Sequence, residues 1–224
     1  MCEILVVTSA DPTPFSAVVD AARAMEYYGS ANFGWGVAWL AGGRIERYRS
    51  IGRLSDEPEA AERLADIRST HFLLHVRRPS KLSTIQIADT QPFLNDDENI
   101  AFAHNGRFVA EDEFRPTYAD RLSGAADSEV GFVMFQDLVA AGAPMVEALE
   151  TVHSKLGGRA NLATLDTNGQ VALYSSYDGN RMWTFRNGDT TVAATELHSA
   201  DNSLFELVFP QATERRQIEG PGTL

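Results

Sequence analysis

The 224-residue chain is 44% hydrophobic and 22% charged, which is typical of a globular protein and suits a single domain over residues 1–224. Its formal net charge of -12 disfavours nucleic acids and anionic membranes as partners, and no apolar run approaches the roughly 20 residues that a bilayer-spanning helix needs. The one cysteine excludes an intramolecular disulfide and a Cys-rich metal site, and the scattered histidines lack the spacing of a helical zinc site, so we expect no metal and no cofactor.

The first half of the chain predicts short strands and two helices. An apolar, β-branched stretch predicts a buried strand over 2–8, and it lacks the features of a secretory signal, so we expect a cytoplasmic protein. Apolar residues at helical spacing predict a helix over 15–27, and a second is expected over 57–67. The segment 79–99 has little periodicity and indicates a long active-site loop. Further strands are expected at 36–40, 44–48, 72–76 and 100–104.

The second half begins with a helical pair and then returns to strands. Helices are predicted over 129–140 and 145–156, split by Gly142 and Pro144. Strand groups on either side of this pair predict an α+β fold of two sheets with helices on their outer faces. Residues after Glu214 resemble a frayed tail. Strands are expected at 161–165, 171–175, 182–185, 191–194 and 204–208.

Cys2 is the first candidate for chemistry because of its position. Removal of Met1 would leave a thiol and a free α-amine on one residue. An α-amine has a pKa of roughly 7.7 to 8.0 and a thiol one of about 8.5, so the amine can take the thiol proton near neutral pH. Taken alone, Cys2 is as easily a small buried hydrophobic residue on a first strand.

Arg77 stands at the end of a candidate strand, in His75-Val76-Arg77-Arg78-Pro79-Ser80. A planar guanidinium suits bidentate binding of a substrate carboxylate. Paired arginines are more often a solvated strand end, but Arg77 shares a strand face with His75, which indicates that it points inward.

The sequence His104-Asn105-Gly106 follows another strand and has two interpretations. Asn-Gly is the strongest short signal of a hairpin turn, and in isolation this interpretation is favoured. The alternative is an oxyanion hole, in which the Asn105 amide and the Gly106 backbone N–H donate to a developing oxyanion.

Asp127-Ser128-Glu129 precedes an apolar helical run, so helix capping accounts for Ser128 and for Asp127 as well. As a functional residue, Asp127 could instead bind a substrate ammonium. A carboxylate for the ammonium, a guanidinium for the carboxylate and an amide-cleaving thiol together describe recognition of an α-amino acid with a side-chain amide.

The order of these motifs resembles that of the class II glutamine amidotransferases. That family has an initial Cys, a His-x-Arg-x-x-Ser/Thr strand end, a His-Asn-Gly sequence and an Asp-Ser/Thr-Glu helix start. The segments 89–93 and 192–196 resemble two further family motifs, so the resemblance spans nearly the whole chain. It is closest to small stand-alone members, such as those that hydrolyse a γ-glutamyl intermediate in ergothioneine biosynthesis.

The resemblance implies a four-layer αββα fold of the N-terminal-nucleophile (Ntn) hydrolases. It also implies that Cys2 attacks a side-chain amide to form a γ-glutamyl thioester, with Asn105 and Gly106 stabilising the oxyanion. Water would then release glutamate or a γ-glutamyl acid product.

The same resemblance implies the substrate-binding residues. Arg77 would bind the α-carboxylate and Asp127 the α-ammonium, and Ser80, His104 and Gly29 would belong to the same site. The family often has Arg-Gly where this chain has Tyr28-Gly29, so an arginine that helps to order the nucleophile region is missing.

Three functions remain open at this stage. The favoured one is a self-contained hydrolase of glutamine or a γ-glutamyl amide. The second is a glutaminase subunit that passes ammonia to a separate synthase partner. The third is a non-catalytic homologue that binds an amino acid without turnover.

Overall fold

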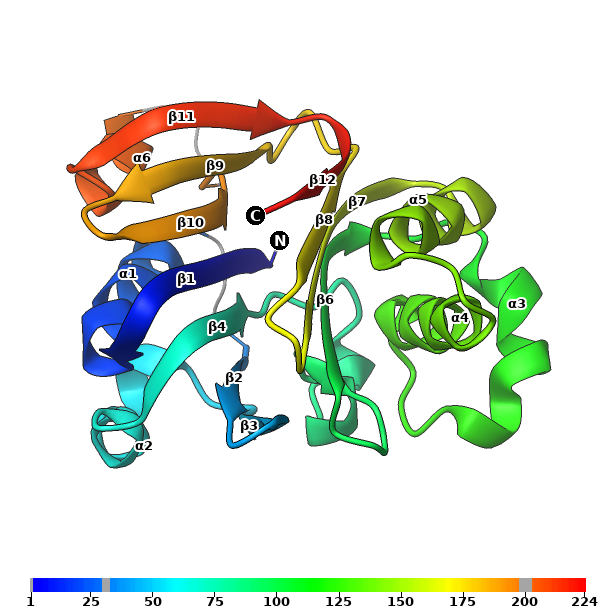
Figure 1. Ribbon diagram of the computed structural model, residues 1–224. Coiled ribbons are helices and arrows are strands. Elements are labelled where there is room, and N and C mark those ends of the chain that lie inside the picture. The colour runs from blue at the N-terminus through cyan, green and yellow to red at the C-terminus, as the bar shows by residue number, and fades with distance from the viewer. Residues whose placement is uncertain (1, 30–32, 198–202) are drawn as a thin grey trace.

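The computed structural model of the protein describes residues 2–29, 33–197 and 203–224. Met1, which we expect to be removed, lies outside these residues. The described chain forms two antiparallel sheets packed face to face, with helices on both outer faces (Figure 1). This is the αββα layering that the sequence predicts.

The larger sheet is built around its first strand in the chain. The twofold repeat of a strand places Leu5 and Val7 on one face, against helices, and Ile4 and Val6 on the other face, against the second sheet. In spatial order, the strands are β11 (Ala212–Ile218), β9 (Met182–Asn187), β10 (Thr190–Thr195), β1 (Glu3–Pro14), β4 (Arg68–Val76), β2 (Trp35–Ala41) and β3 (Arg44–Ser50).

The smaller sheet has five strands, and small side chains such as Ala103 and Ala163 bring it close to the larger one. Its own helix-facing residues, including Phe102 and Leu162, form a separate apolar core with the helices outside. In spatial order, the strands are β12 (Gly220–Thr223), β8 (Val171–Ser175), β7 (Arg159–Asp166), β6 (Ile100–Arg107) and β5 (Phe93–Leu94).

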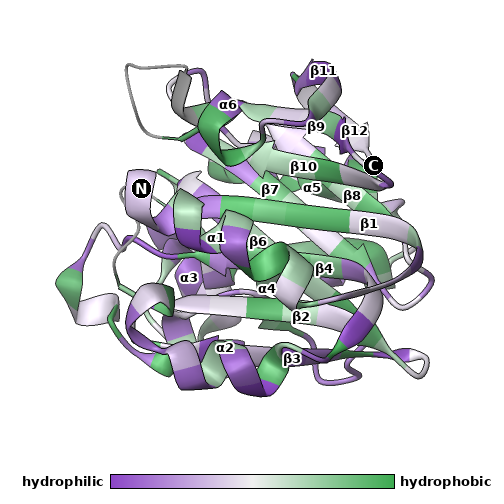
Figure 2. Cartoon of the chain, turned by 90° about the vertical axis from the view of Figure 1, so that its left-hand side faces the viewer, coloured by the Kyte–Doolittle hydropathy of each residue, from purple (hydrophilic) through white to green (hydrophobic). Residues whose placement is uncertain are grey.

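Helices cover the two outer faces. α1 (Ser16–Tyr28), α2 (Pro58–Leu64) and α6 (Ser203–Val208) lie against the larger sheet, and Figure 2 shows the hydrophobic β1 behind α1. α3 (Glu111–Tyr118), α4 (Asp127–Ala140) and α5 (Met145–Leu156) lie on the side of the smaller sheet. In the described part of the chain, no helix is long and apolar enough to cross a bilayer.

Two predictions near the C-terminus are wrong. The strand expected at 204–208 is helix α6, where Phe205 packs on Phe185 with ring centroids 5.3 Å apart. The tail expected to fray after Glu214 instead continues β11 and forms β12, which pair with β9 and β8. Arg215 lies over the Trp183 ring, 4.0 Å from its centroid, so this polar strand is held by contacts that its own sequence does not reveal.

Candidate active site

A pocket opens between the two sheets, where the start of β1 lies beside the end of β4. The antiparallel register pairs Glu3 with Val76, which brings the preceding Cys2 close to the following Arg77. The pocket contains six of the eight residues predicted from the sequence, and Asn105 and Gly29 are not in its lining. The six are Cys2, Arg77, Ser80, His104, Gly106 and Asp127.

Cys2 is half-buried and contacts the backbone of Arg78, just beyond the end of β4. The Arg78 N–H donates to its Sγ at 3.3 Å, and the thiol lies 3.5 Å from the Arg78 carbonyl oxygen. Burial raises the pKa of the Cys2 thiol above its usual value, against the opposing effects of the Arg78 hydrogen bond and the Arg77 charge. The thiol is therefore mainly protonated at neutral pH, and its use as a nucleophile requires a base.

Arg77 is a buried cation at the end of β4, only 3% exposed. Its Nη2 donates to Thr84 Oγ1 at 2.9 Å, whereas its Nη1 has no hydrogen-bond partner among the described residues. Burial lowers the pKa of Arg77, and the charges of Cys2, Asp89 and Asp127 oppose that shift. A buried guanidinium with an unused donor beside a pocket is suited to bind an anion.

His104-Asn105-Gly106 lies inside β6 and is not a hairpin turn. Gly106 pairs with Ala160 of β7, and its φ of 151° is one that other residues rarely adopt. A Cβ on Gly106 would lie 1.9 Å from the Arg159 carbonyl oxygen, so the close approach of β7 requires glycine. The hairpin interpretation is wrong because the partner of this sequence is a strand more than 50 residues away in the chain.

The hydrogen bonds of β6 show which way the Gly106 N–H points. His104 N donates to Gln91 Oε1 at 2.5 Å, on the edge of β6 that faces away from β7. Backbone N–H groups two residues apart face the same edge of a strand, so the Gly106 N–H also points away from β7. Gly106 lines the pocket, and its N–H is therefore a candidate donor to a ligand there.

Asp127 and Ser128 occupy the first turn of α4, and neither caps that helix. Ala126 is at the cap position and no side-chain cap hydrogen bond forms, so the capping interpretation is wrong. Asp127 Oδ2 accepts from the Phe108 N–H at 2.8 Å, and Ser128 Oγ bonds His104 Nδ1 at 2.9 Å. Burial lowers the pKa of His104, with the Asp127 charge opposing, so its neutral ring supports the pocket wall.

The sequence profile described as "Glutamine amidotransferases class-II" matches residues 1–202, which is most of the chain. The chain belongs to the class II glutamine amidotransferases. Among functionally curated proteins, none is significantly similar in sequence.

Solved structures support the assignment of the fold to this family. The "allosteric regulatory enzyme of purine biosynthesis" and the glutamine phosphoribosylpyrophosphate amidotransferase from B. subtilis each show 17% identity over 100% of this chain, with TM-scores of 0.73. The chain spans about half of their length, 48% and 49% respectively. A glutamine aminotransferase class-II domain protein from Silicibacter pomeroyi shows 20% identity over 100% of this chain and 98% of its own, with a TM-score of 0.61. The protein thus has the Ntn-hydrolase fold of this family.

Two predicted site residues of this class II amidotransferase are not among those that line the pocket. Asn105 is fully buried, and its Nδ2 donates to Asn180 Oδ1 at 2.5 Å. The Gly29 N–H donates to Met25 O and ends α1. A Cβ on Gly29 would lie 2.4 Å from the Met25 carbonyl oxygen and 3.3 Å from Glu3 Oε1, so this position at the end of α1 has no room for a larger side chain.

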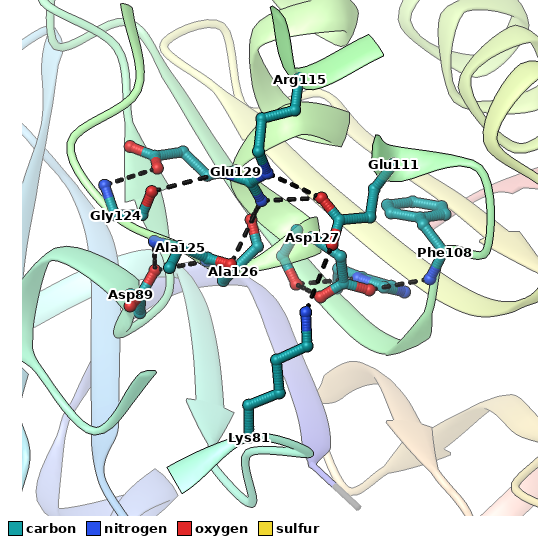
Figure 3. Close-up of polar contacts among 12 residues, drawn as sticks. Lys81, Asp89, Phe108, Glu111, Arg115, Gly124, Ala125, Ala126, Asp127 and Glu129 are labelled. Atoms are coloured by element: carbon teal, nitrogen blue, oxygen red, sulfur yellow. Dashed lines mark hydrogen bonds and ion pairs between the residues drawn. The ribbon is translucent and has the colours of Figure 1, made fainter. Parts of the chain in front are cut away.

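Sequence reasoning assigned no role to Asp89 and Glu129, which position the start of α4. Asp89 Oδ1 accepts from the N–H groups of Ala125 and Ala126 at 2.8 and 2.7 Å, and Glu129 accepts from the Gly124 N–H at 2.8 Å. Figure 3 shows both carboxylates beside this segment. The placement of Asp127 in the pocket therefore depends on them. Asp89 lies in the segment 89–93, which resembles a family motif, and this resemblance is the sequence feature that could have identified it.

The mouth of the pocket carries an ion-pair chain. Glu111 of α3, which is mostly buried, accepts from Arg115 at 2.8 Å, and Lys81 Nζ lies 3.7 Å from its other carboxylate oxygen (Figure 3). Lys81 belongs to the loop after β4, so this contact joins that loop to α3 across the mouth. Lys81 is exposed, so its ion pair with Glu111 is weak.

Proposed function

We propose that the protein hydrolyses the side-chain amide of glutamine, or of a γ-glutamyl-modified metabolite, through a γ-glutamyl thioester on Cys2. The observation that carries the proposal is that one pocket holds both the Cys2 thiol and the buried Arg77, whose Nη1 has no hydrogen-bond partner among the described residues. Family membership supports amide hydrolysis in general.

The pocket has opposite charges for the two ends of an α-amino acid. Arg77 would receive the α-carboxylate through Nη1 while Thr84 holds Nη2. Asp127 would receive the α-ammonium through the carboxylate oxygen that does not accept from Phe108. These contacts would direct the side-chain amide towards Cys2.

The first half of the reaction forms the thioester. After removal of Met1, the α-amine of Cys2 takes the thiol proton, and the sulfur attacks the amide carbon. The carbonyl electron pair moves to oxygen, where the Gly106 N–H and the Asn105 amide would stabilise the negative charge. The carbonyl then re-forms, the C–N bond breaks, and the leaving nitrogen takes the proton from the Cys2 ammonium.

The second half consumes one water molecule. The Cys2 amine takes a proton from water as the oxygen attacks the thioester carbon. The C–S bond then breaks, the carboxylic acid product leaves, and the sulfur takes the proton back from the Cys2 ammonium.

A glutaminase that supplies ammonia to a synthase partner is the second candidate. The observation that favours it is the alignment of the chain with about half of the glutamine phosphoribosylpyrophosphate amidotransferase from B. subtilis. The two candidates differ in the leaving amine: a glutaminase needs glutamine itself, whereas a self-contained hydrolase prefers a larger γ-glutamyl amide.

The test is glutamate release from L-glutamine and a panel of γ-glutamyl amides, with the intact mass recorded for each preparation. We expect protein without Met1 to be active, and we expect Cys2→Ser and protein with a blocked N-terminus to be inactive. Preference for glutamine would favour the glutaminase role, and preference for a substituted amide the self-contained hydrolase. Correctly trimmed protein that binds glutamine but turns over no amide would refute the proposal and leave a binding protein.

A further inference from the structure

Three asparagines from different parts of the chain meet next to the pocket, since Asn105 lies between the lining residues His104 and Gly106. Asn105 lies on β6, Asn161 on β7, and Asn180 on the loop between β8 and β9, and none is more than 1% exposed. The Asn161 Nδ2 donates to the Asn180 backbone oxygen at 2.6 Å, and Ser175 Oγ donates to Asn161 Oδ1 at 2.7 Å. Burying an amide costs free energy unless it is hydrogen-bonded, and these hydrogen bonds offset that cost.

The hydrogen bonds of Asn180 fix which way its amide faces. Its Nδ2 donates to the backbone oxygen of Glu196 and lies 3.4 Å from Glu3 Oε2. A backbone carbonyl can only accept, so the nitrogen of Asn180 must face Glu196 and its oxygen must face the other two asparagines.

This orientation in turn fixes the Asn105 amide. Asn180 Oδ1 accepts from Asn105 Nδ2 at 2.5 Å and from Asn161 Nδ2 at 3.3 Å. If the Asn105 amide were reversed, two carbonyl oxygens would face each other. Asn105 Oδ1 has no hydrogen-bond partner in the described part of the chain, so the hydrogen bond to Asn180 is the one that orients this amide among the described residues.

An amide nitrogen carries two hydrogens, and Asn180 takes only one of them. We propose that Asn180 is a positioning residue, which holds the Asn105 amide so that its second N–H can donate to the oxyanion that forms at Cys2. This inference rests on the proposed function, in which Asn105 is an oxyanion donor.

Asn180 also ties the donor to the strand that carries the nucleophile. Its loop crosses from β8 in the smaller sheet to β9 in the larger sheet. Through Glu3, which also accepts from Thr195 Oγ1 at 2.5 Å, it contacts the residue directly after Cys2. One side chain thus connects the oxyanion donor on one sheet to the start of β1 on the other.

The test compares Asn180→Ala and Asn180→Ser with wild type. Alanine lacks the acceptor, and the serine hydroxyl is too short to reach Asn105 but leaves a smaller void if alanine does not fold. We expect kcat for glutamate release to fall about 10- to 100-fold, while KM and the rate of Cys2 alkylation by iodoacetamide stay within about twofold. A merely structural role would change these three quantities together or not at all.

The matched control is Ser175→Ala, which removes a buried hydrogen bond from the same cluster without touching Asn105. It should lower thermal stability and leave kcat unchanged. A double mutant, Asn105→Ala with Asn180→Ala, should be no slower than Asn105→Ala alone, because Asn180 acts through Asn105.

The outcomes separate the two proposals. If wild type is active and Asn180→Ala and Asn180→Ser keep kcat within about twofold, the positioning role is refuted and the proposed function stands. Multiplicative losses in the double mutant also refute it. If trimmed wild type releases no acid product from any amide, the proposed function fails, and the positioning role fails with it.

Discussion

Replacing Gly106 by alanine tests both the β6–β7 packing and the proposed oxyanion hole. The φ of 151° makes any side chain strained, at about 1–3 kcal/mol. The new Cβ would lie 1.9 Å from the Arg159 carbonyl oxygen, so β7 must move and weaken adjacent ladder hydrogen bonds, each worth about 1 kcal/mol. We expect Gly106→Ala to lower the unfolding free energy by about 3–5 kcal/mol and kcat by about 100-fold or more.

The control is Gly142→Ala, because Gly142 has a φ of 94° and no atom within 4 Å of a Cβ. Its unfolding free energy should fall only by the cost of backbone strain, about 1–3 kcal/mol, and it should keep full activity. Urea unfolding and glutamate release on both variants make the comparison. If Gly106→Ala were no less stable than Gly142→Ala, the close approach of β7 would not be a constraint. If it kept wild-type kcat, the Gly106 N–H would not be an oxyanion donor.

Three further changes have defined outcomes. Arg77→Lys cannot bond Thr84 and a carboxylate together, so KM for glutamine should rise about 10- to 100-fold with a smaller change in kcat. Asp89→Ala removes the acceptor of two backbone N–H groups and should cost about 2–4 kcal/mol in urea unfolding, whereas Asp89→Asn should cost less. Burial lowers the pKa of His75 to about 3, so its unfolded form binds protons that the folded form does not. The unfolding free energy should therefore drop by about 2 kcal/mol between pH 6.5 and pH 5, and by less in His75→Leu. An unchanged KM in Arg77→Lys would contradict the first prediction, and equal unfolding free energies of the two Asp89 variants the second. The third would be contradicted if His75→Leu lost as much stability in acid as wild type.

Local patterns made much of the fold predictable. The apolar, β-branched stretch of β1 and the helical spacing in α1 are local, and the apolar residues that carry them are the ones that the structure buries. The six pocket residues were also predictable, since each belongs to a family-like motif.

Two of the errors come from contacts between residues far apart in the chain, and one comes from the shortness of an element. Asn-Gly has a strong local preference for turns, but the backbone of Gly106 pairs with β7. The apolar run in α6 is too short for its periodicity to separate helix from strand. No local signal marks Asn180, because its role depends on the backbone oxygen of Glu196 and on Asn105, 75 residues before it.

The C-terminal segment has a further consequence, because β11 and β12 are the outermost strands of the two different sheets. A chain truncated after Glu214 would lose most of β11 and all of β12, and so would uncover the backbone of β9 and β8 at once. Unpaired strand edges are templates for pairing with other molecules. We therefore expect the last ten residues to protect these two edges from aggregation, and the truncated chain should scatter more light than the full chain at the same concentration.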